Sequence, residues 1–323
     1  MTQKKPLIIL SGPTAVGKTS LSIGLAKAVG GEIVSADSMQ VYRHMDIGTA
    51  KIRPDQMQGV PHHLIDILEP EEDFNVLRFQ TLAKKAMEGI YERGHIPILT
   101  GGTGFYIQSI LYDIDFKKEA DGSQLRKELE EIAKEQGGEY LYSLLLKEDP
   151  ESAAVIHKNN VKKVIRALEF FRLSGESIAI HNKMERQKEA AYRHAYFVLH
   201  MNREGLYKRI ERRIDQMMED GLLVEVEELK KRGLHRGMVS MSGLGYKEIL
   251  SYLDGEQSLS SAVSQLKRDT RHFAKRQLTW FRRERDVLWL DKEAYPSEDA
   301  ILEQMLRVLK EKEVRYEQNK GNE

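Results

Sequence analysis

Residues 12–19 read GPTAVGKT, which is a specific motif. It matches the pattern G-x-x-x-x-G-K-[ST], with an apolar run at 7–10 before it and a helical pattern to residue 29 after it. Glycines let backbone N–H groups turn toward phosphate oxygens, and the start of the helix adds its positive dipole end. Lys18 supplies a mobile charge and Thr19 a hydroxyl ligand for Mg²⁺. The stretch, here named the phosphate loop, predicts a di- or triphosphate ligand.

The rest of the chain alternates between apolar runs and helical patterns. We predict strands at 32–35, 96–99, 196–200 and 287–290, with helices at 74–93, 203–219, 222–231, 258–285 and 300–312. Strands separated by helices predict an α/β fold in which a parallel sheet is covered by helices on both faces.

Residues 115–194 differ from the rest because helical patterns dominate them and no strand signal interrupts these patterns until the apolar run at 196–200. We therefore predict two domains. Residues 1–114 and 195–323 form an α/β catalytic core with C-terminal helices, and 115–194 form an all-helical insertion. The last nine residues, RYEQNKGNE, are expected to fray.

Composition excludes several classes of protein. The chain has 323 residues and no cysteine, which removes disulfides, thiolate nucleophiles and thiolate zinc sites. No uncharged apolar run approaches the ~18 residues of a membrane helix, and the first residues lack the core of a secretory signal, so we expect a cytoplasmic protein. Fifty basic and fifty acidic residues give zero net charge, and a polyanionic partner must therefore meet a local basic patch.

The segment 267–285 is that patch. It contains eight Lys or Arg residues and two acids, interleaved with aromatic residues. Phe273, Gln277, Trp280 and Phe281 have the spacing of a buried helical stripe, which leaves basic side chains facing outward toward a phosphate backbone. The basic residues predicted to contact the nucleic acid are Arg271, Lys275, Arg276 and Arg282. Lys162, Lys163 and Arg166 form a weaker second patch.

Two polar segments follow predicted strands, and ligands of open α/β sheets bind at the carboxyl ends of strands. Asp37, Ser38, Met39 and Gln40 follow the second strand, and residues 101–104 (GGTG) follow the third. Asp37 is a candidate proton acceptor, an outer-sphere magnesium partner or only a cap for the next turn. Thr103 offers a small hydroxyl beside glycines, although a plain turn explains the same residues.

Two pairs of residues have competing interpretations. Arg209 and Arg213 lie four apart on a predicted helix and suit a polyphosphate, but pairing with Glu211 or Asp215 on the exposed helix is slightly favoured. His62 and His63 are adjacent, before a predicted strand, so their side chains point to opposite faces and structural roles are favoured over metal binding.

Five blocks in this order resemble the tRNA dimethylallyltransferase family, also called tRNA isopentenyltransferases. They are GPTAVGKT at 12–19, SADSMQVYRHMDIGTAK at 35–51, VPHHLIDI at 60–67, GGTGFYIQS at 101–109 and KRQLTWFR at 275–282. The resemblance covers residues 6 to 291, and the absence of cysteine matches the bacterial type, which lacks a zinc finger. It implies a P-loop nucleotide-kinase-like core and transfer of a dimethylallyl group from its diphosphate to the exocyclic amine of the adenosine 3′ of the anticodon.

The same resemblance assigns roles to individual residues. It implies that Asp37 is the general base and that Thr103 contacts the adenine that reacts. It also implies that Arg213 helps to bind the diphosphate, with Arg209 as its neighbour. Magnesium would be held with Thr19. The diphosphate-binding set is Gly12, Pro13, Thr14, Ala15, Val16, Gly17, Lys18, Thr19 and Arg209. The tRNA-binding set comprises Asp37, Ser38, Met39, Gln40, Thr103, Arg126, Lys162, Lys163, Val164, Ile165, Arg166, Ser242, Gly243, Leu244, Gly245, Tyr246 and Lys247.

The predicted partners are thus tRNA, through its anticodon stem-loop, and dimethylallyl diphosphate, with a monomer expected. Two alternatives follow from the phosphate loop alone. One is a kinase of a nucleoside or small metabolite, which needs a γ-phosphate donor. The other is an RNA-binding protein that hydrolyses ATP without modifying a base. Neither explains why the blocks at 35–51, 101–109 and 275–282 occur together.

Overall fold

Parallel strands form the centre of the computed structural model, which describes residues 4–116 and 123–314. The strands are β1 (Pro6–Ser11), β2 (Gly31–Ser35), β3 (His62–His63), β4 (Ile96–Gly101), β5 (Arg193–His200) and β6 (Val287–Asp291). They pair in the order β3-β2-β4-β1-β5-β6, every pair parallel. Strands β1 and β2 are buried along their whole length, which explains why they are apolar runs with little alternation.

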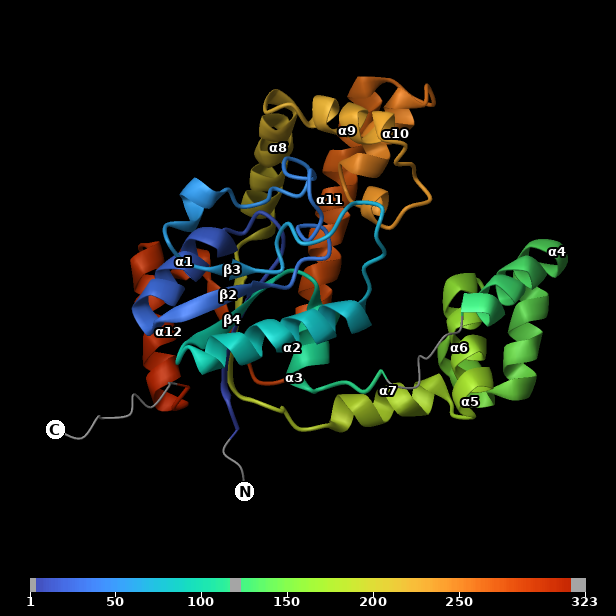
Figure 1. Cartoon of the computed structure of the whole chain (residues 1–323), viewed down its shortest axis with the longest axis horizontal. Helices are drawn as coiled ribbons and strands as arrows, with labels where there is room; N and C mark the ends of the chain where they lie inside the picture. Colours follow the sequence, from blue (N-terminus) through green and yellow to red (C-terminus); the bar gives the residue numbers. More distant parts are fainter. Residues whose placement is uncertain (1–3, 117–122, 315–323) are drawn as a thin grey trace. The chain divides into compact units, whose positions relative to one another are not determined.

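Helices cover both faces of this sheet (Figure 1). Helix α1 (Lys18–Val29) connects β1 to β2, and α2 (Val76–Glu92) connects β3 to β4 in the opposite direction along the sheet. Right-handed crossovers therefore put them on opposite faces. Helix α12 (Glu298–Glu311) packs on α1, whereas α3 (Gly104–Leu111) packs on α2. The predicted α/β fold is confirmed.

Four more helices complete this part of the chain. They are α8 (Arg203–Glu219), α9 (Leu222–Lys231), α10 (Tyr246–Leu253) and α11 (Leu259–Phe281). Helix α11 packs against α3, α8 and α10. The sequence predicted one helix over 258–285; the structure confirms it but ends it at Phe281, and residues 282–286 form the turn into β6.

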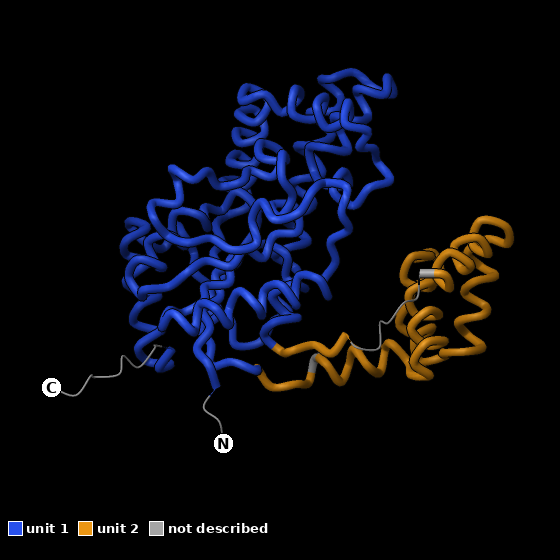
Figure 2. The backbone as a smooth tube through the Cα atoms, viewed as in Figure 1, with its two compact units in different colours: residues 1–111, 191–323 blue, residues 112–190 orange. Residues whose placement is uncertain are grey.

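The chain divides into two compact units, which Figure 2 shows in different colours. Unit 1 comprises residues 1–111 and 191–323, and unit 2 comprises 112–190, close to the segment that the sequence sets apart as 115–194. The described helices of unit 2 are α4 (Ser123–Glu148), α5 (Pro150–Val155), α6 (Val161–Ser174) and α7 (Ile178–Gln187). Leu129, Leu141, Leu145 and Leu168 lie fully buried in its separate apolar core. The tail 315–323, expected to fray, lies outside the described residues.

The segment 60–67 departs from the sequence expectation of a strand after the two histidines. Its strand, β3, is made of His62 and His63 themselves. Leu64 and Asp66 have φ of 64° and 54°, in the left-handed region, so extended pairing ends there. Short edge strands of this kind end a sheet without offering a long row of unpaired backbone groups.

Candidate active site

The loops after β1, β2 and β4 meet at one edge of the sheet. Ser11 pairs with Gly101, and Ser35 pairs with Thr100, so the carboxyl ends of these three neighbouring strands lie level. The amide of Thr103 donates a hydrogen bond of 3.2 Å to the carbonyl of Ala36, directly before Asp37. The predicted proximity of the two polar segments and the phosphate loop is therefore confirmed.

The phosphate loop has backbone angles that favour glycine at both ends. Gly12 has φ 144°, and a Cβ there would collide with the carbonyl of Leu199. Gly17 has φ 100° at the N-cap of α1 and leaves the first turn without a side-chain cap. The free N–H groups of that turn and the helix dipole make this helix start an anion-binding site.

Lys18 closes over the phosphate loop. Its ammonium donates hydrogen bonds of 2.9 Å to the carbonyls of Gly12 and Pro13. Burial, followed by the positive charge of Arg213, lowers the pKa of Lys18 to about 8, and the negative charge of Asp37 opposes this shift. Lys18 therefore interacts electrostatically with both the predicted base and the predicted diphosphate arginine.

The two arginines of α8 reach the site rather than the acids of their own helix. Glu211 is bonded to Arg271 at 2.6 Å, and Asp215 is paired with Lys267 at 2.5 Å, so both acids are used by α11. The Nε of Arg209 donates 2.8 Å to the carbonyl of Ala15 in the phosphate loop. The favoured pairing within the helix is therefore wrong for this pair.

Arg213 is desolvated in the same place. Burial lowers its pKa, and Asp37 opposes that shift. A guanidinium remains charged despite such a shift, so Arg213 is a permanent cation that interacts with the charges of Lys18 and Asp37.

Asp37 does cap the turn that follows it, as one interpretation predicted. Its Oδ1 accepts from the amide of Met39 at 2.8 Å and from that of Gln40 at 3.3 Å. Its Oδ2 accepts no hydrogen bond from any residue that the structure describes. One oxygen therefore fixes the carboxylate while the other is available, and the cap does not exclude a role as proton acceptor.

Gln277 joins the phosphate loop to the loop of Thr103, a role that the sequence analysis did not assign to it. Its Oε1 accepts from the amide of Thr14 at 2.9 Å, and its Nε2 donates to the carbonyl of Gly102 at 3.0 Å. A signal was present, because an amide residue stood on the predicted buried stripe of α11. Gln277 is indeed buried.

A second predicted segment, 242–247, lies against the loop of Asp37. A Cβ at Gly243 would lie 3.0 Å from the sulfur of Met39. The prediction needs one correction here: Tyr246 is fully buried, so its side chain does not face a nucleic acid. Burial leaves contacts in this segment to Ser242, Leu244, Lys247 and backbone groups.

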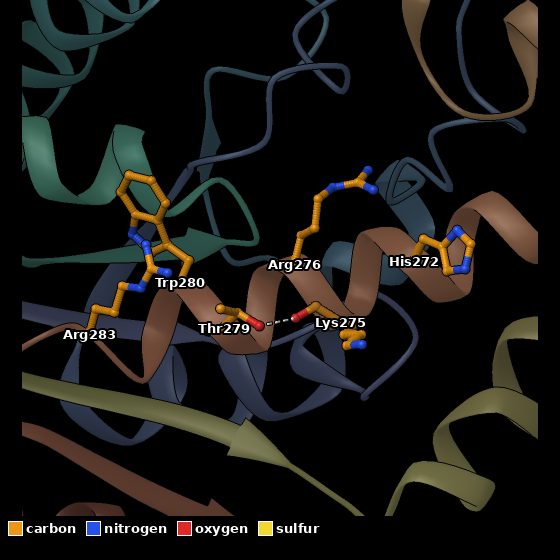
Figure 3. A pocket seen from close by; sticks show the side chains of 6 residues that line it. All are labelled: His272, Lys275, Arg276, Thr279, Trp280 and Arg283. Carbon is orange, nitrogen blue, oxygen red and sulfur yellow. Dashed lines mark hydrogen bonds between the residues drawn. The ribbon is translucent and has the colours of Figure 1, made fainter. Parts of the chain in front are cut away.

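The outer side of α11 presents a basic groove of about 390 Å³ (Figure 3). It is lined by His272, Lys275, Arg276, Thr279, Trp280 and Arg283. Lys275, Arg276 and Arg282 are exposed, as predicted. Arg271 differs, because its guanidinium is bonded to Glu211 and lies over the ring of Tyr207 at 5.8 Å. The stripe is also incomplete: Phe281 is buried, whereas Phe273 is partly exposed.

Unit 2 brings Arg126 and Arg166 together around Glu169. This carboxylate is 5% exposed and lies 2.5 Å from Arg126 and 3.1 Å from Arg166. Lys162 and Lys163 are exposed on the first turn of α6. Val164 and Ile165 are buried in the core of unit 2, so their side chains do not provide the predicted tRNA contact.

The two histidines have structural partners. His63 Nε2 lies 2.7 Å from the buried carboxylate of Glu32, and His62 Nδ1 lies 2.8 Å from the carbonyl of Val60. Structural roles, which the sequence favoured, are confirmed. Among residues 4–116 and 123–314, no group of three His, Asp or Glu side chains is arranged to hold a metal ion. Nor does that part of the chain contain a helix long and apolar enough to span a membrane.

The chain resembles known proteins over most of its length. Residues 40–284 match the family model described as IPP transferase. The chain is 57% identical to the tRNA dimethylallyltransferase of Lachnoclostridium phytofermentans over 310 residues, which cover 96% of this chain and 99% of that protein. It is 47% identical to the same-named protein of Acetivibrio thermocellus over 299 residues, covering 93% and 96%.

Solved structures show the same likeness. A tRNA isopentenylpyrophosphate transferase from Bacillus halodurans is 44% identical, with a TM-score of 0.71 and coverage of 96% of this chain and 98% of that one. A eukaryotic dimethylallyltransferase described as acting on tRNA is 27% identical, with a TM-score of 0.81 and coverage of 98% and 81%. Because the family model spans most of the chain and the relatives match it along nearly their whole length, the chain belongs to the IPP transferase family.

Proposed function

We propose that this chain transfers a dimethylallyl group from dimethylallyl diphosphate to the exocyclic N6 amine of the adenosine 3′ of the anticodon in tRNA. The observation that carries the proposal is the contact between two loops: Thr103 donates to the carbonyl before Asp37, beside the phosphate loop. A leaving-group site and a proton acceptor thus lie side by side in a chain of the IPP transferase family.

The phosphate loop holds the leaving group in this proposal. When the bond between the allylic carbon and oxygen breaks, its electron pair stays on the diphosphate. Negative charge therefore grows on the diphosphate while positive charge grows on the carbon. Lys18, Arg213 and Arg209 stabilise the diphosphate together with the N–H groups at the start of α1. Three cations and a helix dipole that act on one anion favour departure of the diphosphate over its recombination with the allylic carbon.

Asp37 accepts the proton. The lone pair of an adenine amine is delocalised into the ring, so the amine is a weak nucleophile and gains from losing its proton as the carbon–nitrogen bond forms. A general base contributes about 10²–10⁴ in rate. Oδ1 is held by the amides of Met39 and Gln40, which leaves Oδ2 to take the proton. Thr103, whose loop contacts the loop of Asp37, orients the adenine that is modified.

Magnesium fits this site as a partner of the diphosphate. Thr19 is exposed at the start of α1, where its hydroxyl is accessible as a ligand, and the part of the chain that the structure describes offers no cluster of carboxylates to enclose the ion. Mg²⁺ commonly takes few protein ligands and keeps waters and phosphate oxygens instead. When bound, the ion neutralises charge on the diphosphate.

The tRNA binds to basic surfaces on each unit. On unit 1 these are the exposed cations of α11 and the segment 242–247, and on unit 2 they are Lys162, Lys163, Arg126 and Arg166. The insertion predicted at 115–194 thus contributes to tRNA binding. As from the sequence, we expect a monomer that acts in the cytoplasm.

One experiment tests the reaction. The protein is incubated with dimethylallyl diphosphate labelled with ¹⁴C in the allyl group, unmodified tRNA and Mg²⁺. Label should enter the tRNA, and the reaction should release one diphosphate for each dimethylallyl group transferred. A tRNA with guanosine in place of the target adenosine is the control and should stay unlabelled. If ATP is consumed and a phosphorylated small molecule forms instead, the chain is a kinase and the proposal fails.

A further inference from the structure

The side-chain amide of Gln277 is used completely inside the protein. Its oxygen accepts from Thr14 in the phosphate loop, and its nitrogen donates to Gly102 in the loop of Thr103. The side chain comes from α11, which is separated from both loops by more than 170 residues. A single buried amide thus joins two loops that follow different strands.

The amide of Gln277 packs closely against the loop of Thr103. A Cβ at Gly102 would collide with Gln277 Nε2, so the glycine leaves room for the amide. One helical turn further along α11, the indole of Trp280 occupies the corresponding space at Gly104. Gln277 is only 6% exposed, and its hydrogen bonds are therefore not exchanged for water.

The contacts continue from Gly102 to the proposed base. Thr103 follows Gly102 and donates to the carbonyl of Ala36, the residue before Asp37. In the other direction, Thr14 lies in the phosphate loop that Lys18 closes. Gln277 therefore sits at the midpoint of a continuous path from the leaving-group site to the proton acceptor.

The same turn of α11 has a second, outward side. Lys275 and Arg276 are exposed there and line the basic groove of Figure 3. Helix α11 thus presents cations outward, where a nucleic acid would contact it. On its inner side, Gln277 fixes the same turn to the phosphate loop and to the loop of Thr103.

We propose that Gln277 is a positioning residue that sets the separation between the phosphate loop and the loop of Thr103, and so aligns donor and acceptor for transfer. The inference rests on the proposed function. Reacting groups must be held within fractions of an ångström, so loss of this bridge lowers kcat more than it weakens binding of either substrate.

The decisive variant is Gln277→Glu, assayed by label transfer to tRNA from pH 5.5 to 8.5. A neutral carboxylic acid can accept from Thr14 and donate to Gly102, whereas an ionised carboxylate repels the Gly102 carbonyl. Relative to wild type at each pH, kcat should be reduced about 10–100-fold at pH 8.5 and should recover as pH falls. The KM for dimethylallyl diphosphate should change by less than about threefold, because the variant impairs alignment and not binding of this substrate.

Gln257→Glu, the same change just before the start of α11, is the matched control. The Oε1 of Gln257 accepts a hydrogen bond from Ser261, which a carboxylate can also accept, so the ratio of this variant to wild type should not depend on pH. Gln277→Met keeps the length of the side chain and removes both hydrogen bonds, so it should be slow at every pH. A Gln277→Glu ratio that does not vary with pH, or a Gln277→Met enzyme with wild-type kcat, overturns the inference.

A second readout separates this inference from the proposed function. Hydrogen exchange of the Thr14 amide should be faster in Gln277→Met than in wild type, while amides of β5 stay unchanged. If the wild-type protein transfers no label, the proposed function fails, yet the exchange still reports on the bridge. If the Thr14 amide exchanges equally in both proteins, the bridge does not exist in solution and the inference fails.

Discussion

The hydroxyl of Tyr246 donates a hydrogen bond of 2.6 Å to the carboxylate of Glu225, which lies in α9. The same carboxylate accepts from the successive amides of Asp46, Ile47 and Gly48 at 2.9, 2.7 and 3.1 Å. Burial and the charge of Glu225 raise the pKa of Tyr246, so the hydroxyl stays a donor at neutral pH. The pair thus fixes α9, α10 and the segment that follows Asp37 to one another.

We expect Glu225→Gln to lower the free energy of unfolding by about 2 kcal/mol, because a neutral amide is a weaker acceptor for these donors. Tyr246→Phe should cost about 1 kcal/mol. Since both changes break one network, the double variant should lose less than the sum of the two. Urea unfolding of the four proteins measures this coupling, and strict additivity would contradict it.

Asp37→Asn separates the two roles of Asp37. The Asn side chain keeps an oxygen that can accept from Met39 and Gln40, so the turn should persist, but it cannot take a proton. We expect kcat to fall about 10²–10⁴-fold while tRNA affinity and the urea midpoint stay near wild type. Asp37→Ala should lose turnover and also the cap. Label transfer and filter binding measure these effects, and unchanged turnover in Asp37→Asn would remove Asp37 as the base.

Binding of inorganic diphosphate should take up a proton near pH 8.5. Without ligand, the pKa of Lys18 is about 8, so a large part of its population is neutral at that pH. A bound anion favours the ammonium and raises the pKa, which draws a proton from solution. Affinity should consequently decline as pH rises above 8. Calorimetry in two buffers of different ionisation enthalpy measures the uptake.

Lys18→Arg is the control for this proton uptake, since arginine stays charged over the range and has no proton to gain. Uptake that persists unchanged in the variant would assign the titration to another group.

Glu32 should stabilise the fold in a pH-dependent manner. Hydrogen bonds from Arg93, chiefly, and from His63 and His95 outweigh burial and lower the pKa of Glu32 to about 2. Its stabilisation is therefore complete above pH 4.5, the ordinary value, and is lost as pH falls toward 2. Glu32→Gln should cost about 2–3 kcal/mol at pH 7 and progressively less below pH 4.5.

Urea unfolding at several pH values measures this difference, with Glu303→Gln on the exposed side of α12 as control. A Glu32→Gln deficit that is the same at pH 3 and pH 7 would show that packing, and not the charge, accounts for it.

The outward cations of α11 should determine the salt dependence of tRNA binding. Each phosphate contact contributes about 0.7–0.9 to the slope of log affinity against log salt. Lys275→Ala combined with Arg276→Ala should therefore reduce the slope by about 1.5. Arg307→Ala, an exposed cation of α12, is the control and should leave the slope unchanged. A slope unaffected by the double variant would make the basic groove a solvated surface.

The sequence was informative wherever a property is local. The phosphate loop is recognisable from its glycines, its lysine and the helix that follows. The apolar runs predict β1, β2 and β4. The prediction from sequence was wrong where a charged residue has two possible partners. Arg209 and Arg213 have acids within helical reach, and only the position of α11 shows that Arg271 and Lys267 take those acids.

By itself, the amino-acid sequence determined the parallel α/β core, the phosphate loop and the order of the blocks, because periodicity and glycine backbone angles are properties of neighbouring residues. Tertiary structure alone decided that Gln277 joins two loops, that Glu225 holds three amides, and that Tyr246, Val164 and Ile165 face the core. Hydrogen bonds between residues far apart in the chain depend on which elements pack together, and side-chain burial depends on all neighbours at once, so neither can be deduced from a local pattern.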